Sequence, residues 1–149
     1  MNTARGDIEN LLYRYAELID AGDYDGIGEL FAHASIADES GNAMATGAEA
    51  ITKLYHATTR KYDDGTPKTQ HIMTNPLVEF GADGTTATCR ARFTVLQQTD
   101  VLPLQPIISG AYVDSFEHVD GAWRYTEKRM VMRLFGDLSQ HLLIEIPGE

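Results

Sequence analysis

The hydrophobic pattern of this sequence changes near Lys68, and this change constrains the fold more than any other feature. Before Lys68, apolar residues recur at three- and four-residue steps, with the period of about 3.6 that is typical of helices. After it, the period is about 2, and turn residues separate four long segments at 68–80, 85–100, 106–118 and 122–135. We therefore predict an α+β fold in which N-terminal helices pack on one face of a mainly antiparallel sheet.

Three helices are expected ahead of the strands. Residues 8–20 place an apolar stripe along one side of a helix and polar residues along the other. Asp23 has the side chain and the position of an N-cap for a second, shorter helix. After a short pair of strands, Thr46 and Glu49 fit a capping box at the start of a third helix. The first two helices should form a hairpin.

The strand region contains a clear turn signal and a half-polar face. Asp120-Gly121 predicts a type I′ hairpin, because both central residues of that turn need a positive φ. Along 85–98, alternate residues are apolar, with Cys89 among them, whereas the residues between them are half polar. A sheet of this kind usually meets another subunit or lines a cavity with its second face.

Composition indicates one globular domain and excludes several classes of partner. The 149 residues are 43% hydrophobic and 23% charged, so we expect a single domain with a real core. A net charge of -10 argues against nucleic-acid binding, which needs basic side chains to neutralise phosphates. The single cysteine, Cys89, excludes an internal disulfide. Without a signal-peptide pattern or a membrane-length apolar run, we predict a cytoplasmic protein that does not bind membranes.

Asp20 closes the first predicted helix at an electrostatically unfavourable place. A carboxylate at a helix C-terminus is repelled by the negative end of the helix dipole. Two interpretations stay open at this point. Asp20 is either solvated or helps to cap the next helix, or it faces a cavity and has a catalytic partner.

The five histidines fall into two groups. His71 lies inside an extended segment, where an ionisable ring on the inward face needs a partner, so a structural and a functional role are both open. The other four lie near helix ends, at a hairpin and in a polar tail, as surface or capping residues do: His33, His56, His118 and His141. Their spacing matches no metal-binding motif, and we expect no metal site.

Asp20 and His71 together would make a general-base dyad. The carboxylate would fix the tautomer of the imidazole and stabilise the imidazolium that forms when the ring takes a proton. Neither a nucleophile motif nor a phosphate-binding glycine loop accompanies the pair. The predicted chemistry is proton transfer, with no metal or organic cofactor.

Three blocks of the sequence resemble the SnoaL-like branch of the nuclear transport factor 2 superfamily. They are 8–23 (IENLLYRYAELIDAGD), 69–80 (TQHIMTNPLVEF) and 110–129 (GAYVDSFEHVDGAWRYTEKR). The resemblance implies one SnoaL-like domain over 1–149 with a cone-shaped, cystatin-like fold. In that fold three helices pack on a strongly curved, mixed but mainly antiparallel sheet that encloses a pocket. Relatives of this fold include both enzymes and binding proteins, so the fold does not decide the function.

The resemblance also implies roles for individual residues. In scytalone dehydratase, hexachlorocyclohexane dehydrochlorinase and bile-acid dehydratase, an Asp at the end of the first helix and a His on the first long strand form the catalytic dyad. Those positions hold Asp20 and His71 here, and Tyr15 matches a tyrosine of the bile-acid enzyme. Lys128 aligns with a pocket arginine of the dehydrochlorinase, although a bulge in the strand would bring Arg129 to the pocket instead.

The same alignment implies the pocket lining and the class of reaction. The predicted pocket residues are Thr69, Met73, Leu96, Tyr112, Asp114, Met130 and Met132. Their largely apolar, adaptable side chains suit a ring-shaped or terpenoid-like small molecule. We predict a dehydratase-like lyase or isomerase that needs no cofactor, and the alternative is a non-catalytic binding or oligomer-assembly domain. A homo-oligomer, trimer or dimer, is expected, with the tail at 137–149 docking on a neighbouring subunit.

Overall fold

The computed structural model describes residues 3–146, which form three helices and six strands. In chain order the elements are α1 (Ala4–Asp20), α2 (Tyr24–Leu30), β1 (Ser35–Ala37), β2 (Ala43–Thr46), α3 (Ala48–Thr58), β3 (Thr69–Phe80), β4 (Thr86–Gln97), β5 (Gln105–Val119) and β6 (Ala122–Phe135). Among these residues, no helix is both long enough and apolar enough to span a membrane.

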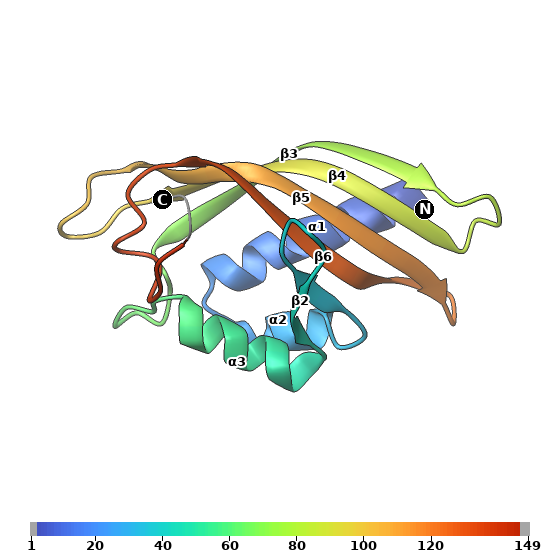
Figure 1. Cartoon of the computed structure of the whole chain (residues 1–149), viewed down its shortest axis with the longest axis horizontal. Helices are drawn as coiled ribbons and strands as arrows, with labels where there is room; N and C mark the ends of the chain where they lie inside the picture. Colours follow the sequence, from blue (N-terminus) through green and yellow to red (C-terminus); the bar gives the residue numbers. More distant parts are fainter. Residues whose placement is uncertain (1–2, 147–149) are drawn as a thin grey trace.

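The six strands form one open sheet in the order β2-β1-β6-β5-β4-β3. All neighbouring pairs are antiparallel except β1 and β6, which run parallel. Figure 1 shows the curved sheet arching over the helices, with α1 next to the sheet and the α2–α3 pair beyond it. The predicted architecture, three helices on a curved, mixed and mainly antiparallel sheet, is confirmed.

The element boundaries follow from local backbone chemistry. Asp23 caps α2 as predicted, since its carboxylate accepts a hydrogen bond of 2.8 Å from the backbone N–H of Gly26. Asp120 and Gly121 have φ angles of 52° and 82°, so the type I′ hairpin between β5 and β6 is confirmed. Lys68 has a φ of 57°, and β3 begins one residue after it.

The capping box predicted before α3 is wrong. Gly47 is the N-cap of this helix, and no side chain caps it. Thr46 ends β2, where its hydroxyl lies 2.7 Å from the hydroxyl of Ser35 on β1, while Glu49 pairs with Lys53 one helical turn later. Because the hydroxyl of Thr46 contacts Ser35 in the strand pair, it does not cap α3. The positive φ of Gly47, 83°, turns the chain directly from strand to helix.

The core lies between α1 and the inner face of the sheet. α1 buries Ile8, Leu12, Tyr15, Ala16 and Ile19, which repeat at helical spacing along its inner side. Opposite them, alternate residues of β4 are buried, including the predicted core cysteine Cys89. This packing directs the C-terminal end of α1, and with it Asp20, towards the first residues of β3.

The segment that follows β6 packs on its own chain. Leu138 is only 2% exposed, and Leu142 forms an isolated bridge with Thr59 at the end of α3. The backbone N–H of Leu143 donates a hydrogen bond to the carbonyl of Thr58. Residues 137–146 therefore close one side of their own domain, and the docking of the tail on a neighbouring subunit stays a prediction.

Candidate active site

Asp20 and His71 are in direct contact. The Nδ1 atom of His71 lies 2.6 Å from Oδ1 of Asp20. Since an ionised carboxylate only accepts hydrogen bonds, Nδ1 carries the proton and donates it to Asp20, which leaves the lone pair of Nε2 free. The side chain of His71 is 3% exposed and that of Asp20 is 22% exposed. The pair has the geometry that a general base and its orienting carboxylate require.

Three donors converge on Asp20 and explain its position at the end of α1. Besides the His71 ring, the backbone N–H of His71 donates to Oδ2 at 2.8 Å and the hydroxyl of Thr69 donates to Oδ1 at 2.9 Å. These hydrogen bonds offset the repulsion from the negative end of the helix dipole. They also hold the carboxylate in one orientation against the imidazole. Of the two interpretations of Asp20, the geometry supports the one with a partner, although Asp20 itself does not line the cavity.

The ring of His71 lines an apolar cavity of about 550 Å³. Helix residues, strand residues and the tail all contribute to its wall: Tyr15, Ile19, Ile36, Leu54, Tyr55, Phe93, Val95, Ile108, Tyr112, Met130, Met132, Phe135, Leu138, His141, Leu142, Ile144 and Ile146. Asp38, Glu39, Ser40 and Glu145 also line it. A cavity of this size and lining fits a hydrophobic small molecule with a few polar groups.

Phenolic hydroxyl groups gather in the cavity wall beside His71. The hydroxyls of Tyr15 and Tyr55 are 2.8 Å apart, and the ring of Tyr15 meets the ring of His71 edge-on, with 6.3 Å between their centroids. Burial, reinforced by Tyr112, holds the pKa of Tyr15 well above its usual range, and burial does the same for the pKa of Tyr55. Both phenols stay neutral, and since the hydrogen bond between them uses one of their two protons, the other proton can be donated to a developing oxyanion.

A buried ion pair lies behind these rings. The Nζ atom of Lys128 is 3.3 Å from Oδ2 of Asp114, and neither side chain is exposed. The ammonium also lies 3.5 Å from the ring centroid of Tyr112 and 4.5 Å from that of Tyr15. Burial raises the pKa of Asp114 to about 6 and lowers the pKa of Lys128, while the charge of each partner opposes the shift of the other.

Lys128, and not Arg129, points into the protein. Arg129 is paired with Glu127 near the surface, since neighbouring residues of a strand face opposite sides. The structure nevertheless separates Lys128 from the cavity, because Tyr15 and Tyr112 contribute to the lining and Lys128 does not. Lys128 therefore contacts the tyrosine rings of the cavity wall and not the cavity itself.

The predicted site residues divide into two sets. Those that line the cavity are Tyr15, His71, Tyr112, Met130 and Met132. Those that do not are Asp20, Thr69, Met73, Leu96, Asp114 and Lys128. Placing Thr69, Met73, Leu96 and Asp114 in the lining is therefore corrected.

Each corrected residue has its own physical reason. Thr69 turns to Asp20, and Asp114 is buried with Lys128. Met73 packs against the core, two residues along β3 from His71. Leu96 lies between the buried residues Val95 and Gln97 of β4, on the opposite face of the strand.

Two cavity residues were missed or misassigned from the sequence. Tyr55 is not among the predicted site residues, yet its hydroxyl pairs with that of Tyr15. His141 was predicted to be a surface or capping residue, but it is 5% exposed and its ring centroid lies 6.2 Å from that of His71. The apolar spacing of Leu138 and Leu142 around it was the only signal of burial in the sequence.

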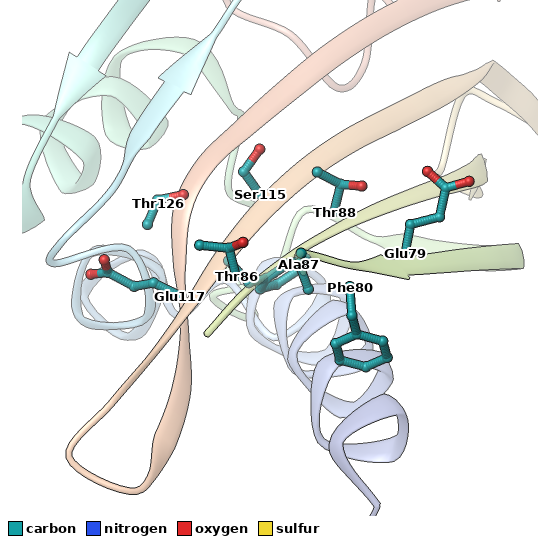
Figure 2. A pocket seen from close by; sticks show the side chains of 10 residues that line it. Glu79, Phe80, Thr86, Ala87, Thr88, Ser115, Glu117 and Thr126 are labelled. Atoms are coloured by element: carbon teal, nitrogen blue, oxygen red, sulfur yellow. The ribbon is translucent and has the colours of Figure 1, made fainter. Parts of the chain in front are cut away.

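A second hollow of about 460 Å³ lies at the end of the sheet near the β3–β4 turn. Figure 2 shows the side chains of Thr86, Thr88, Ser115 and Thr126 on one face of the strands and that of Phe80 on the opposite face. It contains none of the residues that surround His71. Within 3–146, moreover, no group of three or more His, Cys, Asp or Glu side chains is arranged to hold a metal ion. The candidate active site is therefore the cavity beside the Asp20–His71 pair.

Comparisons with known proteins show the family and the fold of this chain. Residues 2–129 match the family described as the SnoaL-like domain. No protein with a curated description matches the sequence. Among solved structures, an NTF2-like protein with a cystatin-like fold from Novosphingobium aromaticivorans has a TM-score of 0.68 and 24% identity over 84% of this chain and 79% of its own.

Two further solved structures share the fold. A protein described as a putative scytalone dehydratase from Novosphingobium aromaticivorans has a TM-score of 0.65 and 21% identity, over 86% of this chain and 83% of its own. LinA has a TM-score of 0.70 and 19% identity, over 91% of this chain and 90% of its own. At these identities the similarity establishes the fold alone.

Proposed function

The chain belongs to the family of SnoaL-like domains, and from this premise and the geometry of its cavity we propose that it is a cofactor-independent lyase or isomerase, dehydratase-like in its chemistry. The single observation that carries the proposal is the hydrogen bond of 2.6 Å between His71 and Asp20 at the wall of an apolar cavity. A structural neighbour described as a putative scytalone dehydratase supports it.

The proposed substrate is a cyclic ketone with an acidic C–H bond next to the carbonyl group. Nε2 of His71 takes this proton, and the electron pair of the C–H bond moves into an enolate. Asp20 stabilises the imidazolium that results. The hydrogen-bonded pair of Tyr15 and Tyr55 hydroxyls donates its free proton to the enolate oxygen in an apolar cavity.

Two reactions can begin with this proton abstraction: dehydration of a β-hydroxy ketone, and isomerisation of a β,γ-unsaturated ketone. In a dehydration, the enolate electrons form a C=C bond and expel a β-hydroxyl group, which leaves as water after it takes the proton from His71. In an isomerisation, His71 returns the proton to another carbon of the conjugated system. Both reactions give a conjugated enone, so both are followed by its ultraviolet absorbance.

The first test measures proton abstraction alone. We expect the protein to catalyse exchange of the α-hydrogens of 2-decalone with deuterium from heavy water, observed by proton NMR. His71→Gln should lose this catalysis by at least about a hundredfold, because general-base catalysis typically contributes that much or more. His118→Gln, at the exposed β5–β6 hairpin, is the matched control and should exchange like the wild type. Wild-type exchange in the His71→Gln protein would contradict the proposal.

The second candidate function is a small-molecule-binding domain without catalysis. The apolar cavity favours it, since a ligand needs only that wall to bind. In this case an Asp20→Asn, His71→Gln double variant would bind a cyclic ketone as well as the wild type does. The ketone would also be recovered from the wild type without deuterium.

A further inference from the structure

His141 is a second imidazole in the cavity wall. Its side chain lines the same cavity as His71, and the two ring centroids are 6.2 Å apart with an angle of 60° between the ring planes. His141 lies in the segment after β6, whereas His71 lies on β3. The fold therefore brings together two histidines that are 70 positions apart in the sequence.

The side chain of His141 is not needed to hold the tail in place. The backbone N–H of His141 donates to the carbonyl of Leu138, and its own carbonyl accepts from the backbone N–H of Arg60. The carbonyl of the preceding residue, Gln140, accepts hydrogen bonds from the hydroxyl of Tyr62 and the amide of Gln97. The main chain therefore anchors this segment and holds the imidazole rigidly.

The imidazole itself lacks a hydrogen-bond partner. Its Nδ1 atom is buried without a partner, and within residues 3–146 no hydrogen bond involves Nε2. Leaving a buried polar group unpaired is costly, so such groups normally have a partner. Because His141 lines the cavity, a ligand bound there would lie next to its ring and could pair with Nε2.

The protonation state of His141 identifies the kind of group that it suits. Burial, together with the nearby His71, lowers the pKa of His141 to about 4. The ring is therefore neutral at neutral pH, with one nitrogen that donates and one that accepts. A hydroxyl group also donates and accepts, whereas a carboxylate only accepts and an ammonium only donates.

Carboxylates at the cavity wall disfavour acidic ligands. Hydrogen bonds from Asn42 hold the pKa of Asp38 below its usual range, and Arg133 does the same for Glu39. Both side chains line the cavity, but Arg133 balances the charge of Glu39, so the carboxylate of Asp38 is the one that repels a negative charge. An uncharged ligand avoids this repulsion.

We propose that His141 binds a hydroxyl group of the substrate, and that the substrate is an uncharged cyclic ketone that also carries a hydroxyl. This inference rests on the proposed function and deepens it. The tyrosine pair takes the carbonyl oxygen, His141 takes the hydroxyl, and His71 faces the carbon between them. His141 thereby selects the hydroxylated ketone and fixes the ring of the ligand in front of the base.

The test compares the binding of two ligands that differ by one hydroxyl, 2-decalone and 4-hydroxy-2-decalone. Isothermal titration calorimetry is done in a His71→Gln background, where turnover does not interfere. We expect the hydroxylated ketone to bind more tightly. His141→Phe should reduce the ratio of the two dissociation constants on the order of tenfold, because one hydrogen bond changes an affinity by about that factor. His141→Gln, which keeps a hydrogen-bonding side chain, should keep most of the preference.

Leu142→Ala is the matched control from the same segment. Leu142 lines the cavity with an apolar side chain. Its removal should weaken the binding of both ketones alike and leave the ratio of their dissociation constants unchanged. An unchanged ratio in His141→Phe would overturn the proposal, and so would the absence of any hydroxyl preference in the His71→Gln protein. The binding ratio does not depend on turnover, whereas deuterium exchange tests the proposed function, so either can fail without the other.

Discussion

Thr69 shows how one hydroxyl group completes the proposed dyad. Its side chain does not line the cavity, and its hydrogen bond goes to the same carboxylate oxygen of Asp20 that accepts from the His71 ring. A carboxylate held by several donors keeps one orientation, and the imidazole that it binds then keeps one tautomer. Thr69 is a positioning residue, and its effect on a ligand should be indirect.

Thr69→Val removes this hydroxyl and keeps the shape of the side chain. We expect kcat to fall by up to about tenfold and KM to change little, because the carboxylate loses one hydrogen bond worth about 1 kcal/mol and the cavity keeps its lining. Steady-state kinetics on an enone-forming substrate would measure both constants. Thr88→Val, on the exposed part of β4, is the control and should leave kcat unchanged. A rise in KM with an unchanged kcat would show that Thr69 contacts the substrate directly.

The turn between α1 and α2 is the element that positions Asp20. Gly22 has a φ of 71°, and a Cβ atom there would collide with the backbone carbonyl oxygen of Gly65. The loop after α3 therefore packs directly on this turn. Both the left-handed backbone and the close approach require glycine at this position.

Gly22→Ala should destabilise the protein far more than an ordinary substitution of a left-handed glycine. Gly84→Ala is the matched control, since Gly84 has a φ of 72° and a Cβ there would meet nothing within 4 Å. Gly84→Ala should lower the free energy of unfolding by about 1 kcal/mol, through backbone strain alone. Gly22→Ala adds the collision with Gly65, so it should lower the free energy of unfolding several times as much. Urea denaturation measures this free energy. An equal decrease in the free energy of unfolding for the two variants would mean that the loop containing Gly65 moves away freely.

At the scale of the whole molecule, two buried groups make stability depend on pH in opposite directions. The pKa of His141 is lowered from 6.5 to about 4, so the unfolded chain takes up this proton more readily. Its contribution to stability is present above pH 6.5 and is lost as the pH falls towards 4. The pKa of Asp114 is raised from 3.8 to about 6, so its contribution is present at low pH and is lost as the pH rises through 6.

His141→Gln should separate these two contributions. Between about pH 6.5 and pH 4, the free energy of unfolding of the wild type should fall by about 3 kcal/mol relative to that of the variant, since the proton of His141 no longer matters in the variant. Urea denaturation at several pH values gives this difference. His118→Gln removes an exposed histidine instead and should follow the wild type at every pH. A difference that does not change with pH would show that His141 bears no burial cost.

Local chemistry in the sequence was sufficient for the elements of the fold and for the identity of the proposed dyad. Periodicity separated the helices from the strands, and Asp23 and Asp120-Gly121 marked a cap and a turn that the structure confirms. These signals depend on residues a few positions apart, which is why they can be read from one sequence. The chemistry of Asp20 and His71 suggested their pairing, the resemblance supported it, and the structure shows the hydrogen bond between them. The predicted homo-oligomer stays a prediction.

Only the tertiary structure decided which side chains share the cavity. Strand pairing diverted the Thr46 hydroxyl from its expected cap, and the rings of Tyr15 and Tyr112 screened Lys128 from the cavity. The fold also brought His141 from a polar tail to the side of His71. A sequence pattern shows which residues can be buried, but the contacts between distant segments determine which of them meet. The helix and strand order is therefore local information, whereas the contents of the site depend on how the tail and the third helix close around it.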